Sequence, residues 1–161
     1  MSIKIETVNY KNSKDLRILE TVISNWFKNP KELNLTEPRI GYPFNFKRWV
    51  ELTYKEANTK SFAFKKDKWI IGIGNIRINK ETKQSHALHI FIDPEYRKRG
   101  LATKMLEHLE AIAYDANMTA ITINVMPKNE PAIKLYKKIG FLIVKSNKNL
   151  WLKFQKNLIY R

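Results

Sequence analysis

The chain has 161 residues, of which 43% are hydrophobic while only 5 are Gly and 6 are Pro. This composition predicts one ordered globular domain over residues 1–161 and excludes a disordered or fibrous chain. The formal net charge of +15 favours a polyanionic partner (nucleic acid, an acidic membrane face or a small ligand with several phosphates), although a lysine-rich solvated surface is an equal alternative.

The N-terminal residues predict a strand followed by a helix. Ile3, Ile5 and Val8 alternate imperfectly with polar residues, and Ser13 with Asp15 marks a helix start ahead of an apolar face. The first residues lack the apolar segment of a signal peptide, and no stretch approaches the length of a membrane span. We therefore expect a soluble cytoplasmic protein that does not enter a membrane.

Residues 28–45 are rich in proline and polar residues, and they predict an irregular connection. A second helix that carries Phe46, Trp49 and Tyr54 follows it. Because connections of this length inside a compact domain often have a function, this segment is a candidate binding region.

Residues 62–78 predict a β-hairpin with a charged turn in its middle. Its second arm contains Gly72 and Gly74, which form a bare Gly-x-Gly. No helix follows these glycines, so we interpret them as a bend or a close backbone approach and not as a phosphate-binding loop.

The remaining elements follow without an internal repeat or an obvious linker. They are a strand at 86–92, a long amphipathic helix at 99–117, a strand at 121–125, a helix at 129–139 and strands at 141–144 and 150–154. The order β-α-α-β-β-β-α-β-α-β-β predicts an α/β fold with one mixed sheet of about seven strands and about four helices on both faces.

The most informative stretch lies where a strand passes into the long helix. The strand ends at Asp93-Pro94, residues 97–99 are all basic, and Gly100 and Ala102 leave the backbone open to close approach. Amide groups at a helix N-terminus point outward together and favour a bound phosphate. The alternative is an ordinary strand-to-helix turn with a basic, solvated rim.

The second informative stretch is the short helix at residues 129–139. Asn129 is a suitable N-cap, Pro131 is tolerated in the first turn, and Gly140 is suited to end the helix. Tyr136 lies on the apolar face of this helix, where it is either a packed core tyrosine or a functional residue.

Together, these two stretches resemble the GNAT superfamily of N-acetyltransferases. Arg97-x-x-Gly100-x-Ala102 is similar to the pyrophosphate-binding signature Gln/Arg-x-x-Gly-x-Gly/Ala of that family. Residues 129–141 are similar to its other signature, Asn-x-x-Ala-x-x-Leu-Tyr-x-x-x-Gly-Phe. With the strand between them, the matched segments cover about residues 86–146.

The resemblance implies that acetyl-CoA is the cofactor of this half of the chain. The pyrophosphate would lie on the amides of residues 97–103, and the pantetheine arm would pair with strand backbone around Ile90 and Ile92. Tyr136 would act as the general acid on the departing thiolate. The implied cofactor-binding residues are Ile90, Phe91, Ile92, Arg97, Lys98, Arg99, Gly100, Leu101, Ala102, Thr103, Asn129 and Tyr136.

The residues also restrict the route of transfer. The chain has no cysteine, which excludes a thiolate metal site, and it has no Gly-x-Ser-x-Gly elbow to supply a nucleophile. We therefore expect no metal, and direct attack by a neutral amine in a ternary complex. His86 stands where some family members carry a glutamate base, and it is either the base or an ordinary polar residue.

The strength of the catalytic base affects which amines can act as acceptors. At pH 7, deprotonation costs roughly 4.6 kcal/mol for a lysine side chain and roughly 1–1.4 kcal/mol for an α-amine. A site with a weak base therefore favours α-amines, or other amines of low pKa, over protein lysines.

The family usually takes its acceptor specificity from the region that corresponds here to residues 26–49. This region contains aromatic side chains that are either the walls of an apolar pocket or plain core. The candidate acceptor-binding residues are Trp26, Tyr42 and Phe44, with Trp49 beside them and with Glu32 or Glu37 to attract a cationic amine.

Several alternatives stay open. The chain could acetylate protein lysines, or bind acyl-CoA without catalysing transfer. A basic nucleic-acid-binding module is a further alternative, supported by the net charge and by the lysines between Lys128 and Lys156. The sequence carries no recognition-helix, zinc or ribonucleoprotein signature. We thus expect a small-molecule or peptide amine as partner and no nucleic acid, with a homodimer left open.

Overall fold

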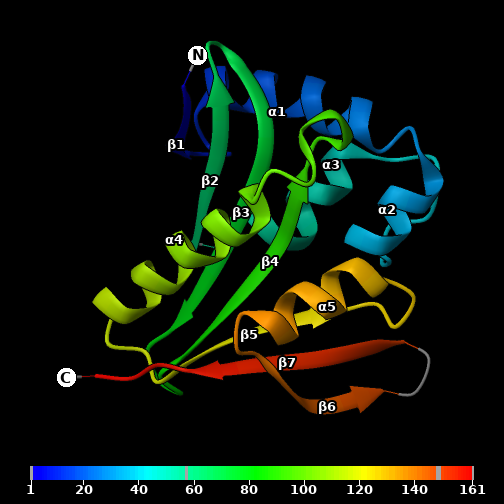
Figure 1. The fold of residues 1–161 in the computed structure, drawn as a ribbon. Coiled ribbons are helices and arrows are strands. Elements are labelled where there is room, and N and C mark those ends of the chain that lie inside the picture. Colours follow the sequence, from blue (N-terminus) through cyan, green and yellow to red (C-terminus); the bar gives the residue numbers. More distant parts are fainter. Residues whose placement is uncertain (1, 57, 148–149, 161) are drawn as a thin grey trace.

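The structure is a computed structural model that describes residues 2–56, 58–147 and 150–160. Within these residues, one seven-stranded sheet runs in the order β1-β2-β3-β4-β5-β7-β6 (Figure 1). The strands are β1 (Ile3–Val8), β2 (Thr59–Lys66), β3 (Trp69–Asn79), β4 (Gln84–Ile92), β5 (Ala120–Val125), β6 (Leu142–Asn147) and β7 (Trp151–Asn157). The α-helices are α1 (Ser13–Trp26), α2 (Pro30–Thr36), α3 (Phe46–Trp49), α4 (Leu101–Asp115) and α5 (Glu130–Lys138). The predicted mixed α/β fold is confirmed.

One helix was not expected from the sequence. The segment 28–45, predicted as an irregular connection, contains α2. The side chain of Asn29 accepts hydrogen bonds from the amides of Lys31 and Glu32, at 3.0 and 3.4 Å. Pro30 follows in the first turn, where its missing N–H costs no hydrogen bond. Pro30 therefore begins a helix here and does not interrupt one.

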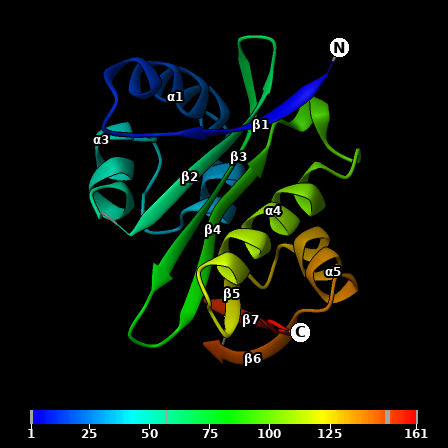
Figure 2. The ribbon, with the colours of Figure 1, turned by 90° about the vertical axis from the view of Figure 1, so that its left-hand side faces the viewer.

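Helices cover both faces of the sheet, and each face has its own core (Figure 2). Strand alternation divides the side chains between the two. Phe62 and Phe64 of β2 belong to the cluster under α4 and α5, whereas Ala63 belongs to the cluster under α1, α2 and α3. None of the described helices is both long enough and apolar enough to cross a membrane.

The two central strands separate part of the way along their length. β4 and β5 are parallel, and they pair only from Gln84 to Ala87 on β4 and from Ala120 to Ile123 on β5. Beyond these pairs β4 continues to Ile92, and the two strands diverge (Figure 1). The facing backbone edges are consequently unpaired beyond Ala87.

A β-bulge in β4 lies at the start of this divergence. Ile73 of β3 pairs with Phe91 and Asn75 pairs with Leu88, so two β4 residues, 89 and 90, oppose the single residue 74. The backbone of His89 is left-handed, with φ of 49°. The side-chain amide of Asn75 donates to the carbonyls of Leu88 and His89 at 3.3 and 3.4 Å. A bulge increases the local twist, which turns the end of β4 away from β5.

Gly74, opposite the bulge, lies directly beneath α4. A Cβ atom built on Gly74 would collide with the side chain of Met105, which is fully buried. The glycine therefore permits close approach of α4 to the sheet, in agreement with its interpretation from sequence.

We predict that Gly74→Val lowers the free energy of unfolding by about 1–3 kcal/mol, because Met105 and α4 must move. Gly41→Val is the matched control, since a Cβ at Gly41 meets no atom within 4 Å. Urea unfolding followed by tryptophan fluorescence measures both variants. Equal midpoints for the two variants would contradict the packing argument.

Candidate active site

A cavity of ≈ 460 Å³ lies where β4 and β5 diverge. Its walls come from both faces of the sheet. The end of α2 and the residues that follow it, 35–39, form one wall, and α5 with the ends of β5 forms another. Leu150 and Trp151, at the start of β7, complete it. The cavity thus joins the two sides of the molecule through the gap between the strands.

Tyr136 reaches this cavity from α5. Its ring packs against Phe141 and Phe154, with ring centroids 6.0 and 5.9 Å away. Burial raises the pKa of its hydroxyl above the ordinary value, so the hydroxyl stays protonated at neutral pH. Asn129, which also lines the cavity, caps α5 by accepting a hydrogen bond from the amide of Ala132 at 3.4 Å. The cap fixes the start of the helix that carries Tyr136.

His86 reaches the cavity from β4. Its Nδ1 lies 2.8 Å from the hydroxyl oxygen of Thr122, and this hydroxyl donates its own proton to the carbonyl of Ser85 at 3.2 Å. In the tautomer in which Thr122 donates to Ser85, Nδ1 of His86 carries a proton and donates it to Thr122, and the lone pair lies on Nε2. Burial lowers the pKa of His86 to about 4, and the nearby charges of Arg77 and Lys153 act in the same direction. His86 is neutral at pH 7, and in this tautomer its Nε2 can accept a proton.

A buried hydrogen-bonded chain forms the wall next to α2. The hydroxyl of Tyr54 donates to Nδ1 of His89 at 2.7 Å, and Nε2–H of His89 donates to the carboxylate of Glu37 at 3.0 Å. His89 also stacks on Trp49, with centroids 3.9 Å apart. Both ring nitrogens of His89 are engaged, and burial lowers its pKa, so it is neutral and has no free lone pair.

Glu37 is the charged member of this chain. Its side chain is 4% exposed and forms a two-bond ion pair with Arg39, with distances of 3.0 and 2.6 Å. Burial acts to raise the pKa of Glu37, but the hydrogen bonds from His89 and Arg39 outweigh it and lower the pKa to about 2. Glu37 is therefore a fixed carboxylate and a poor base. From the sequence, Glu37 is expected only to attract a cationic amine, because no local pattern links it to His89.

The turn from β4 into α4 has the features of an anion site. Gly100 is left-handed, with φ of 79°, and Lys98 has φ of 63°. The first helical hydrogen bond runs from the amide of Lys104 to the carbonyl of Gly100 at 3.1 Å. The amides of residues 98–103, which include those of Arg99, Leu101, Ala102 and Thr103, have no acceptor within the described residues. They are the free donors that the sequence predicts.

The side chain of Arg97 does not face these amides. Its Nε donates to the carbonyl of Ile92 at 3.0 Å, and its two terminal nitrogens donate to the carboxylate of Glu32 at 3.0 and 2.7 Å. Arg97 thus ties α2 to the end of β4. Glu32, considered in the sequence as an attractor of the acceptor amine, is engaged in this ion pair.

The three β4 residues expected beside the cofactor differ in their surroundings. Ile90 is half-buried and lines the cavity. Phe91 is buried in the core under α1 to α3, and Ile92 in the core under α4 and α5. The side chains of Phe91 and Ile92 are core, while the backbone of all three residues lies on the edge that faces the diverged β5.

The candidate acceptor residues Trp26, Tyr42 and Phe44 do not lie on the described walls of the cavity. Trp26 is buried, and its indole N–H donates to the carboxylate of Asp93 at 3.0 Å. Phe44 packs against Phe27 and Trp49, at 5.3 and 5.8 Å between centroids. Tyr42 is 57% exposed. Trp26, Tyr42 and Phe44 are absent from the walls of the cavity as far as the structure describes them; residues 35–39 of the same region stand there.

Comparison with known proteins gives a family and related folds. The sequence profile of the acetyltransferase (GNAT) family matches residues 22–141. The chain is 29% identical over 152 residues to an N-alpha-acetyltransferase of Sulfurisphaera tokodaii, covering 88% of this chain and 89% of the relative. It is 36% identical over 76 residues to an N-alpha-acetyltransferase of Saccharolobus solfataricus, and spans 46% of that relative's length.

Among solved structures, the fold is similar to PaiA N-acetyltransferase from Thermoplasma acidophilum in complex with coenzyme A. The TM-score is 0.75 at 18% identity, over 98% of this chain and all of the other. It is also similar to the GNAT domain of S. lividans PAT, with a TM-score of 0.79 at 15% identity over 97% and 90% of the two chains.

The environment of His86 predicts a pH dependence of stability. Its pKa is about 4 in the folded chain and 6.5 when unperturbed, so the unfolded chain binds more protons between these values. The free energy of unfolding should fall by up to about 3 kcal/mol as the pH falls from about 6.5 to about 4. Urea unfolding at pH 7 and pH 4.5 tests this with His86→Gln, which should remove most of that fall. A variant with the same fall as the parent chain would show that His86 is not held neutral.

Proposed function

The chain belongs to the acetyltransferase (GNAT) family, and on that premise we propose that it transfers the acetyl group of acetyl-CoA directly to a primary amine of a small molecule or a peptide N-terminus. One observation carries the proposal. The gap between β4 and β5 opens a cavity on which a neutral histidine, His86, and a protonated tyrosine, Tyr136, both stand. These are the proton acceptor and the proton donor that amine acetylation needs.

The residues present fit acetyl-CoA. The amides of residues 98–103 form a cradle of donors without acceptors, and Lys98 and Arg99 beside them are exposed cations. The unpaired edge of β4 around Ile90 and Ile92 offers backbone groups for an extended amide-containing arm. When bound, acetyl-CoA supplies the acetyl group as a thioester. The chain holds it through these groups, and Gly100 keeps the cradle free of a side chain.

Tyr136 holds the proton that the leaving sulfur needs. Its hydroxyl has no hydrogen-bond partner among the described residues, and it belongs to a residue that lines the cavity. Because the raised pKa keeps this proton in place at neutral pH, Tyr136 can donate it to the thiolate as the carbon–sulfur bond breaks.

His86 receives the proton that the amine loses as the carbon–nitrogen bond forms. Its Nε2 carries a lone pair, but the lowered pKa makes it a weak base. A weak base produces too little of the neutral form of a lysine side chain at pH 7. An α-amine, in contrast, is already partly neutral at this pH. These properties support α-amines as acceptors over protein lysines.

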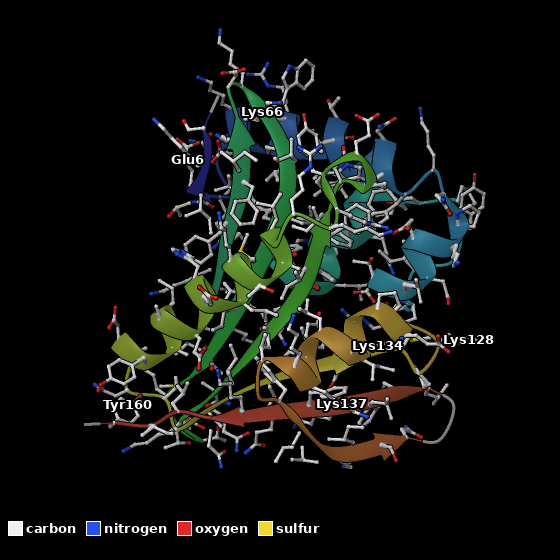
Figure 3. All side chains as sticks on the ribbon, in the orientation of Figure 1. Glu6, Lys66, Lys128, Lys134, Lys137 and Tyr160 are labelled. Atoms are coloured by element: carbon white, nitrogen blue, oxygen red, sulfur yellow. The ribbon has the colours of Figure 1, made fainter. Side chains whose placement is uncertain are left out.

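The rival functions differ in what they predict. A CoA-binding protein without catalysis would be stabilised by CoA but would release no thiol with any amine. A nucleic-acid-binding module would use the lysines on and beside α5, of which Lys128, Lys134 and Lys137 are labelled in Figure 3. Its binding would weaken steeply with salt and would not depend on CoA.

The acceptor class is tested by release of free thiol from acetyl-CoA. We predict that peptides with a free α-amine and small α-amines react at pH 7 with kcat/KM at least about tenfold above an N-terminally blocked lysine peptide. The panel also contains polyamines and aminoglycosides. Equal rates for the lysine peptide would remove the α-amine proposal, and no thiol release from any amine would remove the transferase.

We predict that Tyr136→Phe lowers kcat at least about tenfold and leaves CoA affinity nearly unchanged, because the ring still packs against Phe141 and Phe154 but carries no proton. Steady-state kinetics and calorimetric titration with CoA measure the two quantities. Tyr114→Phe is the control, since Tyr114 is partly exposed at the end of α4, away from the cavity walls. An unchanged kcat in Tyr136→Phe would refute the role as acid.

A further inference from the structure

The charges on the cavity walls are unbalanced. Among the described residues that line it, the ionised side chains are Glu37, Arg39 and Arg77, since His86 and His89 are both neutral. Two guanidinium groups thus face one carboxylate, and the cavity carries an excess of one positive charge. A cation-binding cavity would carry the opposite sign, so the walls favour an acceptor whose second functional group is an anion.

The guanidinium group of Arg39 has N–H donors that are not used within the described residues. Its Nε and Nη2 hold Glu37, and Nη2 also lies 3.3 Å from the hydroxyl of Thr53. Nη1, the other terminal nitrogen, has no acceptor within the part of the chain that the structure describes. The side chain is 55% exposed and lines the cavity, so a ligand can reach this nitrogen. A guanidinium held by one carboxylate can bind a second one through its remaining N–H groups.

Arg77 stands beside the proposed base. It pairs directly with His86 across β3 and β4, and residues paired in this way have Cβ atoms about 5 Å apart. Its nearest acid is Glu56, at 3.3 Å from Nε. The Glu56 side chain is 58% exposed, and Nε of Arg77 is buried without a hydrogen-bond partner among the described residues. Arg77 is therefore available to a ligand whose amine lies at Nε2 of His86.

Both arginines are connected to the same stretch of β4. Arg39 holds Glu37, whose carboxylate accepts a hydrogen bond from Nε2 of His89 at 3.0 Å, and Arg77 pairs with His86. His89 lies three residues after His86 on the same strand. The two arginines therefore flank the stretch of β4 at which the amine would be acetylated.

We propose that Arg39 and Arg77 form an anion subsite for the acceptor, which selects amines that carry a carboxylate close to the reacting nitrogen. This inference rests on the proposed acetyl transfer and names its substrate class. Two kinds of acceptor share the required chemistry: a free α-amino acid, and a peptide with an acidic side chain next to its N-terminus. The carboxylate is held by N–H groups of the arginines, and the amine is thereby directed to Nε2 of His86.

The test uses acceptors that differ only in this charge. One arm compares peptides that begin Ala-Glu with peptides that begin Ala-Gln, and the other compares alanine with alaninamide. All values of kcat/KM are corrected for the fraction of neutral amine, measured by titration of each acceptor. We expect about a tenfold preference for the acid in at least one arm, and a smaller preference at 0.5 M salt. The arm that shows it identifies the source of the carboxylate.

Three variants locate the preference. Arg77→Gln and Arg39→Gln should each reduce the acid-to-amide ratio toward one, while Arg17→Gln, with the same charge change on the exposed face of α1, should keep the ratio of the parent chain. The ratio compares two acceptors on one preparation, so partial unfolding of a variant cancels. Arg77→Gln keeps the test decisive if loss of Arg39 leaves Glu37 unpaired and the chain unfolds.

Each outcome has a distinct meaning. Thiol release with equal kcat/KM for acid and amide in both arms would overturn the anion subsite and leave acetyl transfer standing. A preference that survives in both arginine variants would also overturn it. No thiol release with any acceptor would overturn the proposed function, and the subsite with it.

Discussion

The separation of β4 and β5 is the constraint on which the site depends. Parallel strands normally satisfy each other's backbone along their whole length, yet here pairing stops at Ala87 and Ile123. Two features keep the strands apart: the bulge with its Asn75 hydrogen bonds, and a buried hydrogen-bonded chain. The bulge at His89 bends β4, and the amide of Asn75 holds two bulge carbonyls. The buried chain from Tyr54 through His89 to Glu37 then attaches the bent strand to the helical layer above it.

The site keeps two titratable groups in opposite states through one physical cause. Burial disfavours the charged form of any side chain, so it raises the pKa of Tyr136 and lowers that of His86. The first change secures a proton and the second secures a lone pair. In the proposed reaction, the same burial limits how strong a base His86 can be, so the acidity of the acceptor amine would affect which substrates react.

The turn before α4 and the helix α5 could be predicted from the sequence because short-range sequence patterns define them. The turn before α4 and the capped helix α5 are defined by residues close together in the chain, namely Gly100 and Asn129 with their neighbours, and both form as predicted. The contacts that were missed join distant residues. Glu37 meets His89 52 positions away, and Arg97 meets Glu32 65 positions away. No local sequence pattern predicts either pair, because only the assembled sheet brings α2 against β4.

The ion pair between Arg97 and Glu32 connects two regions with different tasks. One end belongs to the segment that leads into the turn proposed to bind phosphate, and the other belongs to α2, which precedes the proposed acceptor wall. If a ligand bound at the turn restricts Arg97, the same contact restricts α2, and the second ligand then pays a smaller entropy cost of ordering that helix. Thermodynamic reciprocity then requires the acceptor to tighten cofactor binding by the same factor. Cooperative binding of the two substrates would thus follow from a single bidentate contact.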